Sequence, residues 1–131
     1  MIALVVKPSL LGSSKLTRVL AEIAHLDPIV LKGTDVDSLK AEIIELSKAD
    51  SDLIVVACGG GGAFHLALNA LPDLNIQLAV MPLGTGNDFA RYLSIGKPNR
   101  GISILGEGAA ISMDMGTIEL TDGSIVRFAG I

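Results

Sequence analysis

Short apolar segments alternate with amphipathic segments along most of this chain. The apolar runs lie at residues 2–6, 28–31, 53–57 and 77–81. They are apolar at nearly every position rather than at every second one, which is typical of strands covered on both faces. The alternation predicts an α/β fold with three layers, in which a mostly parallel sheet has helices on both faces.

Two ordinary amphipathic helices are expected between the first three strands. Ser13 or Ser14 can cap the first, and Thr34 or Asp35 can start the second. Helical spacing gives each an apolar stripe: Leu16, Val19, Leu20 and Ile23 in the first, and Val36, Leu39, Ile43 and Leu46 in the second. On the second helix, the residues expected to face water are Asp37, Lys40, Glu42 and Glu45.

The third helical segment, residues 63–71, has almost no polar face. It is either buried within this domain or built to contact another domain or a second copy of the chain. Further helices are expected after residue 88 and between residues 102 and 106. The end of the chain predicts a β-hairpin, with strands at 110–120 and 124–129 around the favoured turn pair Asp122-Gly123.

Composition narrows the class of protein. The 131 residues suffice for one compact domain, 1–131, and the net charge of −4 with scattered basic residues argues against a nucleic-acid partner. The single cysteine, Cys58, cannot form an internal disulfide, and no apolar run is long enough to cross a bilayer. We therefore expect a cytoplasmic protein without a transmembrane segment.

Two glycine-rich turns carry the candidate chemistry. Residues 57–63 place a strand, four glycines and a helix in succession, which favours an anion at the helix N-terminus; close packing of helix on strand is the alternative explanation. Residues 82–88, PLGTGND, follow the next strand and should reach the same sheet edge. Neither turn matches the P-loop or the dinucleotide-binding pattern, so an oxidoreductase nucleotide domain is disfavoured.

Other polar side chains have simpler explanations. Lys7 and Arg91 could reach a phosphate, although a solvated position suits each of them as well. His65 fits a hydrogen-bonded histidine in a core or interface, and Cys58 fits a small buried filler rather than a reactive thiol. Two isolated histidines and one cysteine predict no metal site.

The segments CGGGGAFHLALNAL and LAVMPLGTGNDFARYL, with LVVKPS, SMDMGTI and RFAGI, resemble one known family. It comprises the catalytic domains of diacylglycerol kinase and sphingosine kinase type lipid kinases, which are similar to NAD kinases and phosphofructokinases. The resemblance implies transfer of the ATP γ-phosphoryl group to a lipid hydroxyl at a membrane surface, with Mg²⁺. It also implies that a second, β-rich domain completes the active-site cleft, and we expect residues 1–131 to lack that domain.

Matching motif positions assigns roles to individual residues. The resemblance implies that the phosphates of ATP lie along Gly59, Gly60, Gly61, Gly62 and Ala63. It implies further nucleotide contacts from Gly84, Thr85, Gly86 and Asn87, and it places the candidate catalytic carboxylates Asp88 and Asp114 at the cleft.

The chain departs from the family pattern in the first turn. The family reads Gly-Gly-Asp-Gly-Thr, whereas here Gly61 stands at the Asp position and Ala63 at the Thr position. Lys7 also replaces an Asn, and His65-Leu66 replaces Asn-Glu. Phosphoryl transfer needs a carboxylate to organise the metal or to accept the hydroxyl proton. We therefore expect nucleotide binding with weak or absent kinase activity. The alternative is a non-catalytic relic that binds a nucleotide or a partner, and self-association through helix 63–71 or the hairpin is a further expectation.

Overall fold

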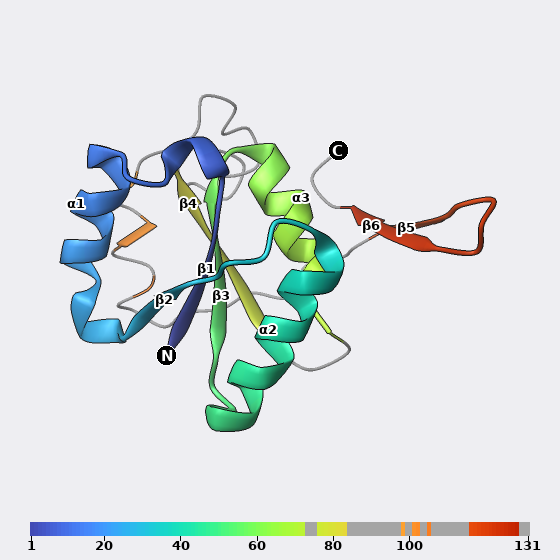
Figure 1. The fold of residues 1–131 in the computed structure, drawn as a ribbon, viewed down its shortest axis with the longest axis horizontal. Helices are drawn as coiled ribbons and strands as arrows, with labels where there is room; N and C mark the ends of the chain where they lie inside the picture. The colour runs from blue at the N-terminus through green and yellow to red at the C-terminus, as the bar shows by residue number, and fades with distance from the viewer. Residues whose placement is uncertain (73–75, 84–97, 99–100, 103–104, 106–115, 129–131) are drawn as a thin grey trace.

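The first four strands form one parallel sheet in the computed structural model of this chain (Figure 1). They are β1 (Ile2–Val6), β2 (Pro28–Val30), β3 (Ile54–Gly59) and β4 (Gln77–Pro82), in the spatial order β2-β1-β3-β4. All three pairings are parallel, which confirms the predicted sheet. The structure describes residues 1–72, 76–83, 98, 101–102, 105 and 116–128.

Helices cover both faces of this sheet, as the sequence predicts. Helix α1 (Ser14–Glu22) lies on one face, and α2 (Val36–Ala49) and α3 (Gly61–Ala70) lie on the other (Figure 1). Two short 3₁₀ turns, η1 (Pro8–Leu10) and η2 (Ala24–Leu26), flank α1. The elements therefore form three layers.

The strands bury their side chains in two separate cores because successive residues point to opposite faces. The core under α2 and α3 includes Ala3, Val5, Val55, Ala57, Leu39, Ile43 and Phe64. The core under α1 includes Ile2, Leu4, Val56, Cys58, Met81, Leu16, Val19 and Ile23. Burial on both faces explains why the strand segments are apolar at nearly every position.

Side-chain caps set the starts of α1 and α2. The Ser13 hydroxyl accepts a hydrogen bond from the Leu16 amide at 3.2 Å. The Asp35 carboxylate accepts one from the Ser38 amide at 2.8 Å, and this bond is the main reason why the pKa of Asp35 is lowered. Of the two capping residues considered for each helix, the structure selects Ser13 and Asp35.

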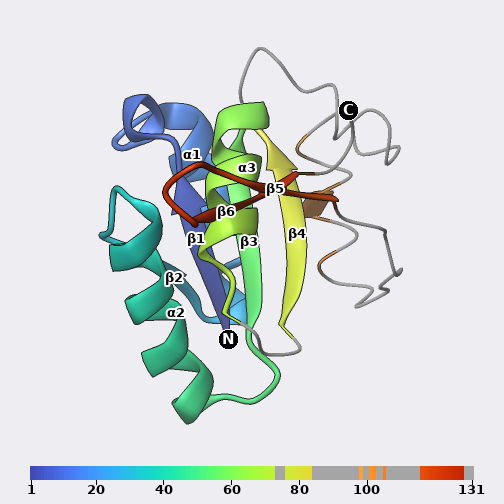
Figure 2. The ribbon, with the colours of Figure 1, turned by 90° about the vertical axis from the view of Figure 1, so that its right-hand side faces the viewer.

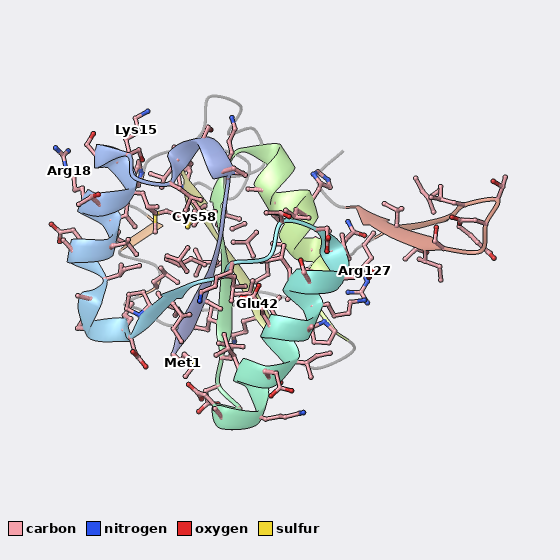
Figure 3. The ribbon with its side chains drawn as sticks, in the orientation of Figure 1. Met1, Lys15, Arg18, Glu42, Cys58 and Arg127 are labelled. Atoms are coloured by element: carbon pink, nitrogen blue, oxygen red, sulfur yellow. The ribbon has the colours of Figure 1, made fainter. Side chains whose placement is uncertain are left out.

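Glu42 does not simply face water, as its place on the polar side of α2 predicted. Its carboxylate is half-buried and accepts hydrogen bonds from the amides of Lys32 and Gly33, in the loop after β2 (Figure 3). The amide nitrogen of Lys32 lies 2.9 Å from Glu42 Oε2. Glu42 therefore fastens that loop to α2.

Several predicted boundaries differ from those observed. Strand β3 continues to Gly59 and α3 begins at Gly61, so the helix starts two residues before the predicted 63 and only Gly60 separates the two elements. The hairpin strands β5 (Gly116–Glu119) and β6 (Ile125–Phe128) are shorter than predicted within the described residues. The helix predicted after residue 88 lies outside those residues.

The hairpin projects away from the sheet and its helices in Figure 1 and points toward the viewer in Figure 2, and its strand β6 is in contact with α3. Strand β6 contacts α3, and the side chain of Asn69 bonds the backbone of Arg127. The apolar side chains of α3 share one core with the sheet and with α2, so the apolar character of this helix reflects burial against both.

Candidate functional site

The glycine turn, residues 59–63, lies at the carboxyl edge of the sheet, where β3 ends and α3 begins. Gly60 is the N-cap and has no side chain to bond the amides that follow. The first intrahelical bond runs from the Phe64 amide to the Gly60 carbonyl oxygen. Among the described residues, the amides of 61–63 therefore point beyond the helix end without a hydrogen-bond partner, at the positive end of its dipole.

Gly59 needs to be glycine for two reasons. Its φ of +144° is a conformation that other residues rarely adopt. A Cβ atom placed on it would lie 3.1 Å from the Cβ of Ala63 and 3.2 Å from the Cβ of Lys7. The turn thus packs β1, β3 and α3 tightly together on this side.

Gly61 and Gly62 meet different surroundings. A Cβ atom added at either position would have no heavy atom of the described residues within 4 Å, so, as far as the structure describes it, open space lies beside Gly61 and Gly62. Because close packing does not require these two glycines, packing alone does not explain the tetraglycine. The open space and the three free amides suit a multiply charged oxyanion such as a phosphate.

The turn supplies no carboxylate. Residues 59–63 contain no acidic side chain, and no group of three or more potential metal ligands occurs among the residues that the structure describes. The described part of the site therefore fits a phosphate but does not fit Mg²⁺, which prefers carboxylate and phosphate oxygens.

The two polar side chains beside the turn are positioned by local contacts. The Nδ1 atom of His65 donates to the carbonyl oxygen of Gly61 at 2.9 Å, and its ring meets Phe64 edge to face. Lys7 donates its amide to the Cys58 carbonyl oxygen at 3.1 Å and keeps its side chain exposed. Lys7 thus lies beside Gly59 with an exposed side chain, while the His65 ring is held by a hydrogen bond within the first turn of α3.

Cys58 is not a reactive thiol. It is fully buried under α1 (Figure 3), and burial raises its pKa to about 12. A thiol that stays protonated at neutral pH is a poor nucleophile. The structure therefore agrees with its interpretation as a small core residue.

The second glycine-rich loop begins beside the first. Gly59 pairs with Pro82 at the ends of β3 and β4, so the described chain leaves the sheet at residue 83, next to the glycine turn. The predicted site residues Gly84, Thr85, Gly86, Asn87, Asp88 and Asp114, and also Arg91, lie outside the described residues. Their roles stay predictions.

Sequence reasoning missed one pair of polar residues, Asn69 and Arg127. They are 58 positions apart, and the Asn69 side chain bonds both the amide and the carbonyl oxygen of Arg127. The available signal was that Asn69 and His65 are the only polar side chains in the segment 63–71. Nothing in the sequence indicated what Asn69 would bond.

Comparisons with a family model and with known proteins both match this chain to diacylglycerol kinases. Residues 12–118 match the family model of the diacylglycerol kinase catalytic domain. The diacylglycerol kinase of Mycobacterium tuberculosis is 28% identical over 115 residues, which are 85% of this chain and 37% of that protein. Human diacylglycerol kinase zeta is 39% identical over 59 residues, 42% of this chain and 6% of that protein. The chain thus spans well under half the length of these relatives.

A solved structure described as "A putative diacylglycerol kinase from Bacillus anthracis str. Sterne" has a similar fold. It superimposes with a TM-score of 0.63 at 24% identity, covering 82% of this chain and 39% of that one. At this identity the likeness concerns the fold alone. Within the described part of the present chain, no helix combines the length and the apolar character needed to cross a membrane.

Proposed function

Since this chain belongs to the diacylglycerol kinase catalytic domain family, we propose that it is the nucleotide-binding part of a lipid kinase. Its substrate would be ATP, whose γ-phosphoryl group the family would transfer to a lipid hydroxyl. The observation that carries the proposal is the glycine turn at the carboxyl edge of a parallel sheet: within the described part of the chain, the amides of residues 61–63 have no hydrogen-bond partner, and Gly61 and Gly62 have open space beside them.

The backbone of the glycine turn would bind the phosphates of ATP. Amides of Gly61, Gly62 and Ala63 would donate to phosphate oxygens, and the helix dipole would add a favourable field. Gly59 would let β3 and α3 approach closely enough to hold these amides in place. Residues 84–87 would contact the nucleotide from the neighbouring strand end, as the family resemblance implies.

The same turn argues against strong catalysis. Mg²⁺ would neutralise charge on the transferring phosphoryl group, but Gly61 stands where the family has an Asp, and the turn offers the ion no carboxylate. Asp88 and Asp114 stay the proposed catalytic residues. We therefore propose weak or absent kinase activity with retained nucleotide binding.

Removal of one amide tests the phosphate-binding role of the turn. Gly61→Pro deletes the N–H of the first helical residue, a position where proline is well tolerated, and the preceding Gly60 already has an extended backbone. Gly61→Ala is the matched control, because it keeps the N–H and adds its Cβ to open space.

Isothermal titration with ATP, with and without Mg²⁺, measures the effect. A hydrogen bond to a charged group contributes about 1.5–3 kcal/mol, so we expect Gly61→Pro to weaken ATP binding by roughly tenfold or more. Gly61→Ala should bind like the wild-type protein. Absence of ATP or ADP binding at millimolar nucleotide, in a folded wild-type protein, would refute the proposal.

The rival function is that of a non-catalytic relic of the family. It is favoured because Gly61 and Ala63 stand where the family pattern has the polar residues Asp and Thr. Restoring them tests it: the double variant Gly61→Asp, Ala63→Thr is made in the full-length gene product and assayed for phosphorylation of diacylglycerol. Mg²⁺-dependent phosphorylation gained by this variant supports a decayed kinase. A folded variant that binds ATP and transfers nothing supports the relic.

A further inference from the structure

The side-chain amide of Asn69 bonds both backbone groups of one hairpin residue, Arg127, as the backbone of a neighbouring strand would. Its Oδ1 atom accepts a hydrogen bond from the Arg127 amide at 2.6 Å, and its Nδ2 atom donates to the Arg127 carbonyl oxygen at 3.0 Å. Nδ2 also donates to the His65 carbonyl oxygen at 2.8 Å, one turn back along α3. That second bond holds the side-chain amide in the orientation that pairs with β6.

The side chain of Arg127 in turn bonds the backbone at the end of α3. Its guanidinium Nη1 atom donates to the carbonyl oxygen of Leu71 at 2.8 Å and lies 3.4 Å from that of Leu68. These carbonyl groups end α3, where the helix dipole is negative and favours a cation. Figure 3 shows the Arg127 side chain between the hairpin and the helical part of the domain.

Burial alone does not hold the hairpin in place. Over residues 117–127, Arg127 is the only residue that is not exposed, and Ile118 and Ile125 keep 51% and 63% of their surface accessible. A two-stranded hairpin has little stability of its own in water. Its position on the domain therefore depends strongly on the polar contacts of Asn69 and Arg127.

We infer that Asn69 and Arg127 form a clamp that fixes the hairpin relative to the glycine turn. The turn begins α3 and the clamp grips its C-terminal end, and ten helical residues span only about 15 Å. Because α3 is buried against the sheet, it acts as a rigid link between the two. Asn69 and Arg127 are thus positioning residues, and the inference does not rest on the proposed function.

Distances between spin labels test the clamp directly. One label goes on α2 through Ala41→Cys and one on the hairpin turn through Thr121→Cys, both at exposed positions. The native Cys58 is fully buried and does not compete for the label. We expect a narrow distance distribution in the parent protein, and at least a twofold broader one after Asn69→Ala or Arg127→Gln, since each variant loses side-chain hydrogen bonds between α3 and β6.

A matched control separates the clamp from general effects of the substitution. Arg18→Gln makes the same change on the exposed surface of α1, on the far face of the sheet (Figure 3), and should leave the distribution narrow. Circular dichroism confirms that each variant is folded. A distribution that stays equally narrow in both clamp variants would overturn the inference.

Amide exchange in the unmodified protein gives a second, independent readout. The Arg127 amide should be protected, and Asn69→Ala should speed its exchange by about fivefold or more while amides of β1 keep their rates. An Arg127 amide that exchanges at the unprotected rate in the wild-type protein refutes the clamp, even if a variant fails to fold. Both experiments use nucleotide-free protein, so failure to bind ATP would affect only the proposed function.

Discussion

Two glycines three positions apart should respond in opposite ways to the same substitution by alanine. Gly59 ends β3 with a φ of +144°, whereas Gly62 lies in the first turn of α3. An added Cβ at Gly59 would meet the Cβ atoms of Ala63 and Lys7, at 3.1 and 3.2 Å, but at Gly62 it would meet no described atom within 4 Å. The surroundings of each glycine therefore decide the sign of the change in stability.

The size of the stability change expected for each substitution follows from the surroundings of the glycine. A non-glycine residue in a sparsely populated backbone region costs about 1–3 kcal/mol. The contacts at Gly59 add to this cost, because a Cβ atom moves only with its own backbone, and we expect a loss of about 2–4 kcal/mol for Gly59→Ala. Gly62→Ala should gain about 0.5–1 kcal/mol, because glycine in a helix is less favourable than alanine by that amount.

Urea denaturation followed by circular dichroism measures both variants against the wild-type protein. The two free energies of unfolding should differ by about 3 kcal/mol or more, which corresponds to roughly 10 °C between their melting temperatures. If Gly59→Ala is as stable as the wild-type protein, or if Gly62→Ala is destabilised as much as Gly59→Ala, the explanation of the turn is wrong.

Three further predictions concern other parts of the molecule. Glu42→Ala should lower the free energy of unfolding by about 1.5–3 kcal/mol in urea denaturation, because the amides of the loop after β2 lose a charged acceptor. Cys58 should react with Ellman's reagent only as fast as the protein opens, since its buried thiol has a pKa of about 12. The hydrogen bond from the Met1 ammonium lowers the pKa of Asp50 from the ordinary value of an Asp, so its stabilising effect is fully present above that ordinary pKa and is lost in acid as the pH falls through the lowered one. Melting temperatures measured from pH 2 to 6 should therefore decline less steeply in acid for Asp50→Asn.

Each of the three predictions, on Glu42, Cys58 and Asp50, would be contradicted by a specific result. Glu45→Ala is the control for Glu42, because the contact of Glu45 in the described part of the chain is an exposed ion pair with Lys48; an equal loss in both variants would contradict the role of Glu42. Reaction of Cys58 at the rate of a free thiol in the folded protein would contradict its burial. An unchanged acid slope in Asp50→Asn would show that the bond to the N-terminus does not persist in solution.

The sequence predicted the sheet because burial on both faces leaves a strong local pattern. A strand covered by helices on both sides must be apolar at nearly every position, and β1 was located at its observed bounds from this pattern alone. The starts of α1 and α2 were narrowed to two residues each, because capping depends on a side chain within three positions of the amide that it bonds.

The glycine turn was located correctly, but its geometry was not foreseen. Glycine has a low helix propensity, so the pattern placed the start of α3 after the tetraglycine, whereas the helix begins inside it. The different roles of Gly59 and Gly62 depend on how closely β1 and α3 approach β3, which no local pattern records.

Local spacing in the sequence by itself determined the layers, the parallel strands and the likeness to a kinase family, since these depend on periodic burial and on short contiguous motifs. Only the tertiary structure decided that Glu42 fastens a loop and that Asn69 grips Arg127, because each contact joins groups that chain folding brings together from 9 to 58 positions apart. A polar side chain carries no local sign of a distant partner, whereas an apolar one shares its burial with neighbours at regular spacing.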